Sequence, residues 1–389
     1  MNLSLPCPEL HRFHDRNLQR QAARKWRRGL FEQPIPGYFI ESRRWNSLSR
    51  NNQFIMRISA IAKEHPHWPL ATVSAAAILG ASARNSRLYD FVHFATDSHT
   101  STRKRTILPV RFHYIKDSRC EKVRNGVPHD THNLQIGNAT CNQMNKYIPI
   151  TESIGLFNGY LVTSPIQTIF DCLRMLPFED ALIICDKLAK KFSITYKQML
   201  NFTLGRHRCW KSIIAGFKEQ FVDPKSENGG ESFCRARMIR AGISIPLLQV
   251  EIPNPLHSLG KRIGSSFQNT RMIRPDYVWN VPSHVGDFTS IAAELDGKQK
   301  YINSNLLQQS HSSSTTDIIL REKDRETALN LSGFKVVRFQ FEEALANHGA
   351  IMIEKLRLAG VPFVDTWQKR KRQRLLARIL GDKTLHKLQ

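Results

Sequence analysis

The sequence predicts a mixed α/β protein of more than one domain, with a mixed β-sheet flanked by helices in its C-terminal part. The length of 389 residues suits two or three domains, and a hydrophobic share of 41% supports folded cores rather than disorder. Near the C-terminus, helix and strand patterns alternate in an order typical of a sheet covered by helices. We expect helices over residues 231–241, 315–331 and 342–358, and strands over 247–252, 273–279, 291–301 and 334–341.

The composition points to a polyanionic partner. The formal net charge is +24, which favours nucleic acid, with a membrane-surface or ribosome-associated role as the weaker alternative. No apolar run approaches the length of a membrane span, and the first residues lack a signal-peptide pattern. The seven cysteines form no Cys-x-x-Cys pair, which argues against a disulfide framework and a zinc site. We therefore expect a cytoplasmic protein with no membrane attachment.

Changes in composition divide the chain into four regions. Residues 1–42 form a short module, residues 43–222 an α/β region, residues 229–362 the domain with the mixed sheet, and residues 363–389 a basic tail. The stretch between the second and third regions is rich in Pro, Gly, Ser and Asn, as linkers are.

The first region predicts a basic helix over residues 17–28, followed by a turn at Pro36-Gly37 that enters a strand. This pattern is that of a shortened winged helix-turn-helix whose cations meet DNA phosphates. A basic, solvated helix with no register on DNA explains it equally well. The basic tail, residues 363–389, likewise either contacts phosphates or forms a solvated charged helix, and the net charge favours phosphate contact. The cations expected to bind nucleic acid in these two regions are Arg24, Lys25, Arg27, Arg28, Lys369, Arg370, Lys371 and Arg372.

Acidic residues gather in the two adjacent strand patterns of the third region. Glu294 and Asp296 lie on one face of the second strand, because side chains alternate along a strand. Asp276 begins the first strand and reaches the same place if the strands pair. Lys298 joins the acids if the second strand stays regular past Gly297.

Carboxylates gathered in this way take up protons or bind a divalent cation, and oxygen ligands suit Mg²⁺ or Mn²⁺. Such a cation polarises a phosphodiester and activates water, and a lysine stabilises the charge that develops on the phosphate. Pro275-Asp276 followed by Asp296-Gly297-Lys298 spells the PD-(D/E)xK nuclease pattern. Solvated charges on a surface turn are the competing interpretation. Neither a phosphate-binding P-loop nor a Gly-x-Ser-x-Gly elbow is present.

Beyond this acidic pattern, residues 231 to about 345 resemble the bacterial domain related to very-short-patch-repair endonucleases. Glu231-Ser232 opens its first helix, Asp276-Tyr277-Val278-Trp279 matches an Asp-aromatic-x-Trp strand, and Glu294-Leu295-Asp296-Gly297 matches a Glu-x-Asp-Gly turn. A later Arg-x-x-x-Leu-x-x-x-Gly-aromatic-x-Val-x-Arg signature runs from Arg325 to Arg338. The resemblance implies a restriction-endonuclease-like fold and contact of both arginines with nucleic acid.

The resemblance also implies roles for the acids. Asp276 and Glu294 would hold the metal, Asp296 would be a further ligand, Glu231 would complete the shell, and Lys298 would stabilise charge. Two positions depart from the family pattern: Lys300 stands where the family usually has His, and Glu326 follows Arg325 where it usually has Asp. The missing histidine puts the proton-transfer step in doubt and allows a domain that binds without cleaving.

The N-terminal half resembles the AbiEi-type antitoxin family. The matching pieces are Pro36-Gly37-Tyr38-Phe39, the small-residue run from Ser74 to Gly80, Val162-Thr163-Ser164-Pro165, and the segment from Ala181 to Asp186. This resemblance implies DNA binding and a toxin or other regulatory partner.

Two hypotheses follow: a DNA-binding protein with a metal-dependent endonuclease domain, or a non-catalytic DNA-binding regulator with a degenerate nuclease fold.

Overall fold

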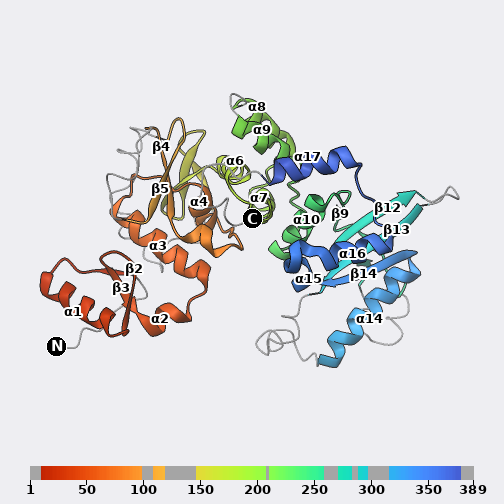
Figure 1. The fold of residues 1–389 in the computed structure, drawn as a ribbon, viewed down its shortest axis with the longest axis horizontal. Coiled ribbons are helices and arrows are strands. Elements are labelled where there is room, and N and C mark those ends of the chain that lie inside the picture. The colour runs from red at the N-terminus through yellow and green to blue at the C-terminus, as the bar shows by residue number, and fades with distance from the viewer. Residues whose placement is uncertain are drawn as a thin grey trace. The chain divides into compact units, whose positions relative to one another are not determined.

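A computed structural model of the chain describes residues 10–98, 108–118, 146–206, 210–257, 270–282, 288–296 and 315–377. The chain divides into two compact units, shown as a ribbon in Figure 1. Unit 1 comprises residues 1–176 and 191–220, and unit 2 comprises residues 177–190 and 221–389. No helix of the described segments is long and apolar enough to span a lipid bilayer.

Unit 1 begins with a small module built around a basic helix. Asp15 caps α1 (Arg16–Arg27) by accepting hydrogen bonds from the amides of Asn17 and Leu18. Gly29 follows the helix with a φ of +72°, a left-handed conformation that suits glycine after a helix end. The helix packs Ala22 against a three-stranded antiparallel sheet of order β1-β3-β2. Its other face is free to carry charge.

The rest of unit 1 is a sheet covered by helices. The parallel pair β4-β5 and the antiparallel β6-β7-β8 are joined through Leu70, which bridges to Phe94 of β4 and to Val162 of β8. Helix α6 packs against α4 and α9. The described elements of unit 1 are β1 His11–Arg12, α1 Arg16–Arg27, β2 Phe31–Ile35, β3 Tyr38–Glu41, α2 Ser42–Ser47, α3 Arg50–Glu64, α4 Thr72–Ile78, η1 Ser86–Tyr89, β4 Val92–Thr96, β5 Val110–Tyr114, β6 Ile148–Pro149, β7 Ile154–Phe157, β8 Tyr160–Thr163, α6 Pro165–Met175, α8 Tyr196–Leu204 and α9 Trp210–Glu219.

Unit 2 is built on a four-stranded mixed sheet of order β14-β13-β12-β9, in which only the β13-β14 pair is parallel. The expected order of helices and strands is confirmed, as is the α+β class. The described elements are α7 Phe178–Lys191, α10 Gly229–Ala241, β9 Leu247–Leu248, β10 Ile252–Pro253, β11 Met272–Ile273, β12 Tyr277–Pro282, β13 Phe288–Asp296, α14 Thr315–Leu331, β14 Phe334–Gln340, α15 Phe341–Leu345, η4 Ala346–Gly349, α16 Ala350–Ala359 and α17 Thr366–Leu376.

Three expected elements of unit 2 are interrupted, so these predictions were wrong in detail. The strand expected over 273–279 is divided, because Ile273 ends β11, which pairs with β10, and β12 begins only at Tyr277. The strand over 247–252 breaks at Gln249, whose φ of +51° ends β9 before β10 begins. The helix over 342–358 breaks into α15 and α16 at Asn347 and His348, which both have positive φ. A left-handed residue cannot continue either a strand or a right-handed helix.

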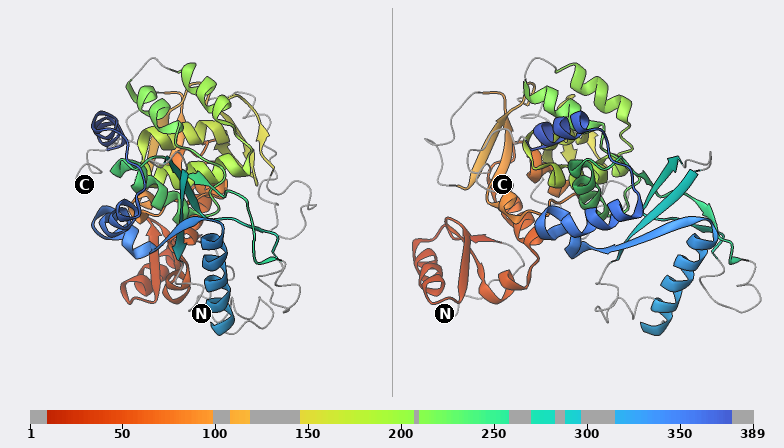
Figure 2. Two further views of the ribbon diagram at one scale, coloured as in Figure 1. Left: turned by 90° about the vertical axis from the view of Figure 1, so that its right-hand side faces the viewer. Right: turned by 45° about the vertical axis from the view of Figure 1, so that its right-hand side comes forward.

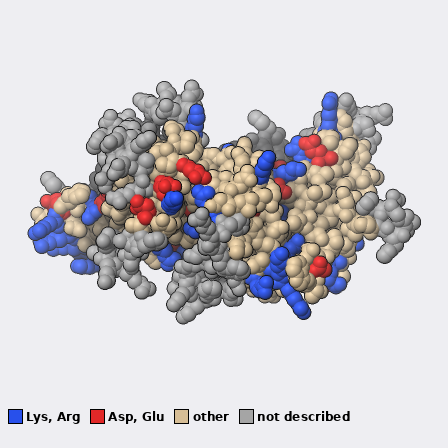
Figure 3. Space-filling model, turned by 90° about the horizontal axis from the view of Figure 1, so that it is seen from above, with Lys and Arg blue, Asp and Glu red and all other residues tan. Residues whose placement is uncertain are grey.

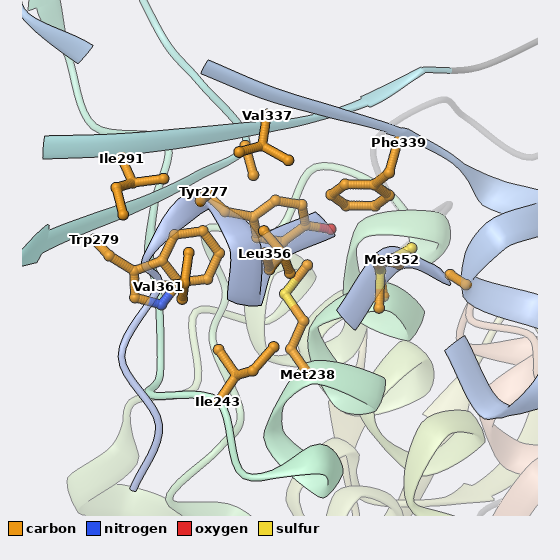
Figure 4. Packing of buried hydrophobic residues seen from close by; sticks show 14 of the residues in the cluster. Met238, Ile243, Tyr277, Trp279, Ile291, Val337, Phe339, Met352, Leu356 and Val361 are labelled. Carbon is orange, nitrogen blue, oxygen red and sulfur yellow. The ribbon is translucent and has the colours of Figure 1, made fainter. Parts of the chain in front are cut away.

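The sheet of unit 2 has a different apolar core on each face. On one face, Tyr277, Trp279, Ile291 and Phe339 pack against α10 and α16, as Figure 4 shows in close-up. On the other face, Ala292 packs with Ala328 and Leu329 of α14. Figure 2 shows α14 on one side of the sheet and α10 and α16 on the other. Because side chains alternate, β13 sends Glu294 and Asp296 to the α14 face, together with Ala292.

Helix α7 packs in unit 2, although the sequence had placed it in the 43–222 region. Its Asp186 accepts a hydrogen bond of 2.8 Å from the guanidinium of Arg235 on α10, and the two side chains are 2% and 1% exposed. The same guanidinium donates to the carbonyl of Phe221. Burial raises the pKa of Asp186, and the charge of Arg235 opposes that rise. The pair joins two helices far apart in the sequence.

The basic tail is a docked helix as far as residue 376. In α17, Leu375 and Leu376 are buried, and α17 packs against α10. Arg372 is buried too and donates to the carbonyl of Ile243 at 2.8 Å. Asp365 caps the helix through the amide of Gln368. This helix is therefore part of the fold of unit 2.

The buried pair of α7 and α10 generates a stability prediction. Asp186→Asn removes the negative charge and leaves the Arg235 guanidinium buried without a counter-charge, which typically costs about 3–5 kcal/mol. We expect a loss of this size in the free energy of unfolding, measured by urea denaturation. The matched control is Glu354→Gln, which breaks the fully exposed pair with Arg357 and should have a far smaller effect. Equal losses in the two variants would contradict the role of the pair.

Candidate functional site

The acids of β13 lie beside two arginines on the α14 face of the sheet. Arg325 of α14 donates from Nε to Glu294 at 2.6 Å and also bonds the carbonyl of Arg274. Arg338 of β14 donates from Nε to both oxygens of Asp296, at 3.0 and 3.2 Å. Each acid therefore already has a cationic partner with charge-assisted hydrogen bonds, which are stronger than neutral ones.

Further acids surround Arg338. Its Nη2 atom lies 3.1 Å from Glu322, and its Nη1 atom lies 3.8 Å from Glu326. Burial lowers the pKa of this guanidinium, but the hydrogen bond and charge of Asp296 outweigh burial, so that the pKa is raised. Arg338 is thus the cation on which Asp296 of β13 and two acids of α14 converge.

Asp276 and Glu231 lie at the ends of neighbouring elements. The register of β12 on β13 pairs Tyr277 with Ala293, so the next pair along brings Asp276 opposite Glu294. A carboxylate oxygen of Asp276 accepts the amide of Leu295 at 2.8 Å. The acid therefore fixes the backbone of β13 at the point where the two carboxylates of that strand are presented.

Glu231 sits in the first turn of α10. Its carboxylate accepts the Glu227 amide at 2.7 Å and the Asn228 side-chain amide at 2.5 Å, and Asn228 in turn caps the helix. Burial, followed by the negative charges of Asp276 and Glu227, raises the pKa of Glu231 to about 7. The residue after Asp276 touches the same turn, because the hydroxyl of Tyr277 donates to the carbonyl of Glu231 at 2.9 Å.

The expected metal ligands do not form a metal site as they stand. Within the segments that the structure describes, no three His, Cys, Asp or Glu side chains converge in a way that could hold a metal ion. Glu294 and Asp296 are neutralised by arginine, so a divalent cation would have to displace Arg325 and Arg338. The residues thus do not fit Mg²⁺ or Mn²⁺ in this arrangement, and the cofactor stays a prediction from the sequence. Lys298 and Lys300 lie outside the described residues.

The cations of α1 form an exposed basic face. Arg24, Arg27 and Arg28 are exposed, whereas Lys25 is half-buried and its ammonium lies 5.1 Å from the centre of the Phe31 ring. Arg16 and Arg20 are exposed on the same helix, and no acid lies in its first turn. Arg20 lies within the basic helix expected over residues 17–28, whereas Arg16 lies just before that range and was not expected to belong to it. The helical spacing of Arg16 from Arg20 and Arg24 was the signal that could have found it. Figure 3 shows this group of Lys and Arg at its left edge.

The cations of α17 divide between the surface and the core. Arg370 is exposed, and Lys369 and Lys371 are half-buried. Arg372 is buried, and its guanidinium lies 5.6 Å from the centre of the Phe221 ring in addition to its bond to Ile243. Arg372 is therefore a structural residue rather than a surface contact, because its charge faces the interior.

No family model, curated protein or solved structure matches this chain. The resemblances to the very-short-patch-repair-related domain and to the AbiEi-type family therefore stay predictions from the sequence.

A polar constellation in unit 1 was also missed. His93 of β4 and His113 of β5 approach to 2.7 Å between Nδ1 and Nε2, with Thr72 3.2 Å from the same Nδ1 atom. Thr72 has a φ of +47°, a strained conformation for a β-branched residue. The parallel register that places His113 beside Ala95 brings the two rings together, and local sequence patterns do not encode that register.

The raised pKa of Glu231 generates a prediction about stability and pH. Its folded-state pKa, about 7, lies above the ordinary value of 4.5, so the folded protein holds this proton more tightly than the unfolded chain does. The resulting stabilisation is complete below about pH 4.5 and is lost as the pH rises through 7. Glu231→Gln, which mimics the protonated acid, should weaken this dependence between about pH 5 and pH 7.5 in urea unfolding.

Glu354→Gln is the control for this experiment. A hydrogen bond from Arg357 lowers the pKa of Glu354, so that this acid stays ionised throughout the same pH range. The control should keep the pH dependence of the wild-type protein. If the free energy of unfolding of Glu231→Gln depends on pH as strongly as that of the wild-type protein, burial and repulsion do not raise the pKa of Glu231.

Proposed function

We propose that the protein binds DNA through the exposed basic face of α1. The observation that carries this proposal is the set of exposed arginines on α1, opposite the side that packs Ala22 against the sheet. A helix supported in this way by a small sheet presents its cations together, and the net charge of +24 adds long-range attraction for a polyanion. Phosphate contacts of this kind position a protein on DNA without reading its sequence.

We propose that unit 2 is a nuclease-like scaffold that binds without cleaving. The order α10, β9, β12, β13, α14, β14 with a mixed sheet supports the likeness to restriction-endonuclease folds that the sequence resemblance implies. Pairing of Glu294 with Arg325 and of Asp296 with Arg338 supports a binding role, because these acids are satisfied without a metal ion. A non-catalytic DNA-binding regulator of the antitoxin kind, with a toxin or regulatory partner, is the function that combines both units.

A metal-dependent endonuclease is the second candidate, and one observation favours it. Asp276 and Glu227 lie close enough to Glu231 for their negative charges to add to the burial that raises its pKa. A bound cation relieves such repulsion. This candidate requires Glu294 to leave Arg325.

The DNA-binding proposal predicts a change in salt dependence when α1 loses charge. For duplex DNA, the logarithm of the binding constant falls with the logarithm of salt concentration, with a slope of about −0.9 per phosphate contact. In the triple variant Arg20→Gln, Arg24→Gln, Arg27→Gln, we expect weaker binding and a slope smaller by about 2–3, measured by fluorescence anisotropy with a labelled duplex.

The matched control removes three exposed cations elsewhere, as Arg87→Gln, Lys187→Gln, Lys197→Gln. This control lowers the net charge equally, so it separates general attraction from direct phosphate contact. Equal slopes in the two triple variants would contradict α1 as the contact surface. A wild-type protein whose binding ignores salt would contradict the DNA-binding proposal itself.

A further inference from the structure

Trp367 is a large aromatic side chain of unit 2 that lies at the surface. It lies in the first turn of α17 and is 68% exposed, although the indole ring is large and mostly apolar. Core packing does not explain it, since the buried residues of this helix are Arg372, Leu375 and Leu376, on the opposite side. An exposed aromatic ring of this size points to a binding role.

The outward face of α17 places cations next to this ring. Residues 367, 370, 371 and 374 share one side of the helix, because they are three and four positions apart. The ammonium of Lys371 lies 5.0 Å from the centre of the Trp367 ring, a cation–π contact. Arg370 and Arg374 are exposed, and α17 contains no Asp or Glu at all. One aromatic ring and three cations thus lie together on a single face.

This face is held rigidly by the buried side of the helix. Arg372 bonds the carbonyl of Ile243, and the amide of Val364 donates to the carbonyl of Gly242 at 2.9 Å. The side chain of Lys369 lies so close to Gly242 that a Cβ atom there would come within 2.9 Å of it. A face fixed in advance loses little conformational freedom when it binds a ligand.

We propose that the outward face of α17 binds unpaired nucleotides, with Trp367 stacking on a base and with Arg370, Lys371 and Arg374 contacting phosphates. Bases in an intact duplex are stacked on one another and offer no face to a side chain, whereas a single strand offers every base. A ring beside a group of cations suits a strand that exposes a base next to its phosphates. This proposal rests on the proposed nucleic-acid binding. It adds that unit 2 prefers single-stranded to double-stranded nucleic acid.

The test compares Trp367→Ala with Trp367→Phe on two probes, a single-stranded oligothymidylate and a duplex of the same length. Trp367→Ala loses the stacking contact with one base, which should weaken single-strand binding by about fivefold or more. Trp367→Phe keeps an aromatic ring and should keep most of the affinity. Duplex binding should be nearly unchanged in both variants. Anisotropy titrations at one salt concentration measure all four affinities.

Tyr196→Ala is the matched control, because Tyr196 is also a half-exposed aromatic residue that stands beside a lysine, on α8 of unit 1. It should leave binding to both probes unchanged. An equal affinity of wild type and Trp367→Ala for the single strand would overturn the proposal, as would an equal loss on both probes. A wild-type protein that binds neither probe would instead overturn the proposed function, so the two failures are distinguishable.

Discussion

The structure of unit 2 depends on arginines that neutralise acids beside and beneath its sheet. Glu294 is buried, and an isolated carboxylate in such a place is costly unless it is paired and hydrogen-bonded. Arg325 supplies that pairing from α14 and so ties the helix to β13. Arg338 does the same for Asp296 from the neighbouring strand. The acids that the sequence suggests as metal ligands thus hold the layers of the fold together.

The same principle organises the opposite side of the unit. Asp186 and Arg235 are almost completely buried and bring α7 onto α10, while Arg240 of α10 bonds Glu179 at 2.8 Å. Arginines that are paired with buried acids contribute little to the positive electrostatic potential outside the protein. In the proposed binding of nucleic acid, the attraction therefore comes from cations exposed on the surface, among them the arginines of α1 and of the outward face of α17. This division explains why net charge alone does not locate the binding surface.

Local sequence patterns were sufficient to predict the order of helices and strands. They did not predict which charged side chains pair when they lie far apart in the sequence. The alternation around Ile291 and Ala293 and the helical pattern of 315–331 were sufficient to predict β13 and α14, because each is set by burial of one face. The partner of Glu294 was not predictable, since Arg325 lies 31 positions away and the pattern does not say which way its side chain points. The basic composition of α17 likewise concealed that Arg372 turns inward. The sequence predicted charged residues to lie on the surface or to bind ligands, whereas several of them form ion pairs or hydrogen bonds that stabilise the fold.

Arginine is the counter-charge of both Glu294 and Asp296 in this structure, and on this ground we propose that unit 2 binds nucleic acid without cutting it. The most direct measurement incubates purified protein with supercoiled plasmid and Mg²⁺ or Mn²⁺, beside Asp276→Asn and Glu294→Gln. We expect the same fraction of the plasmid to stay supercoiled with all three proteins. Nicking by the wild-type protein that disappears in both variants would contradict it and would establish the endonuclease.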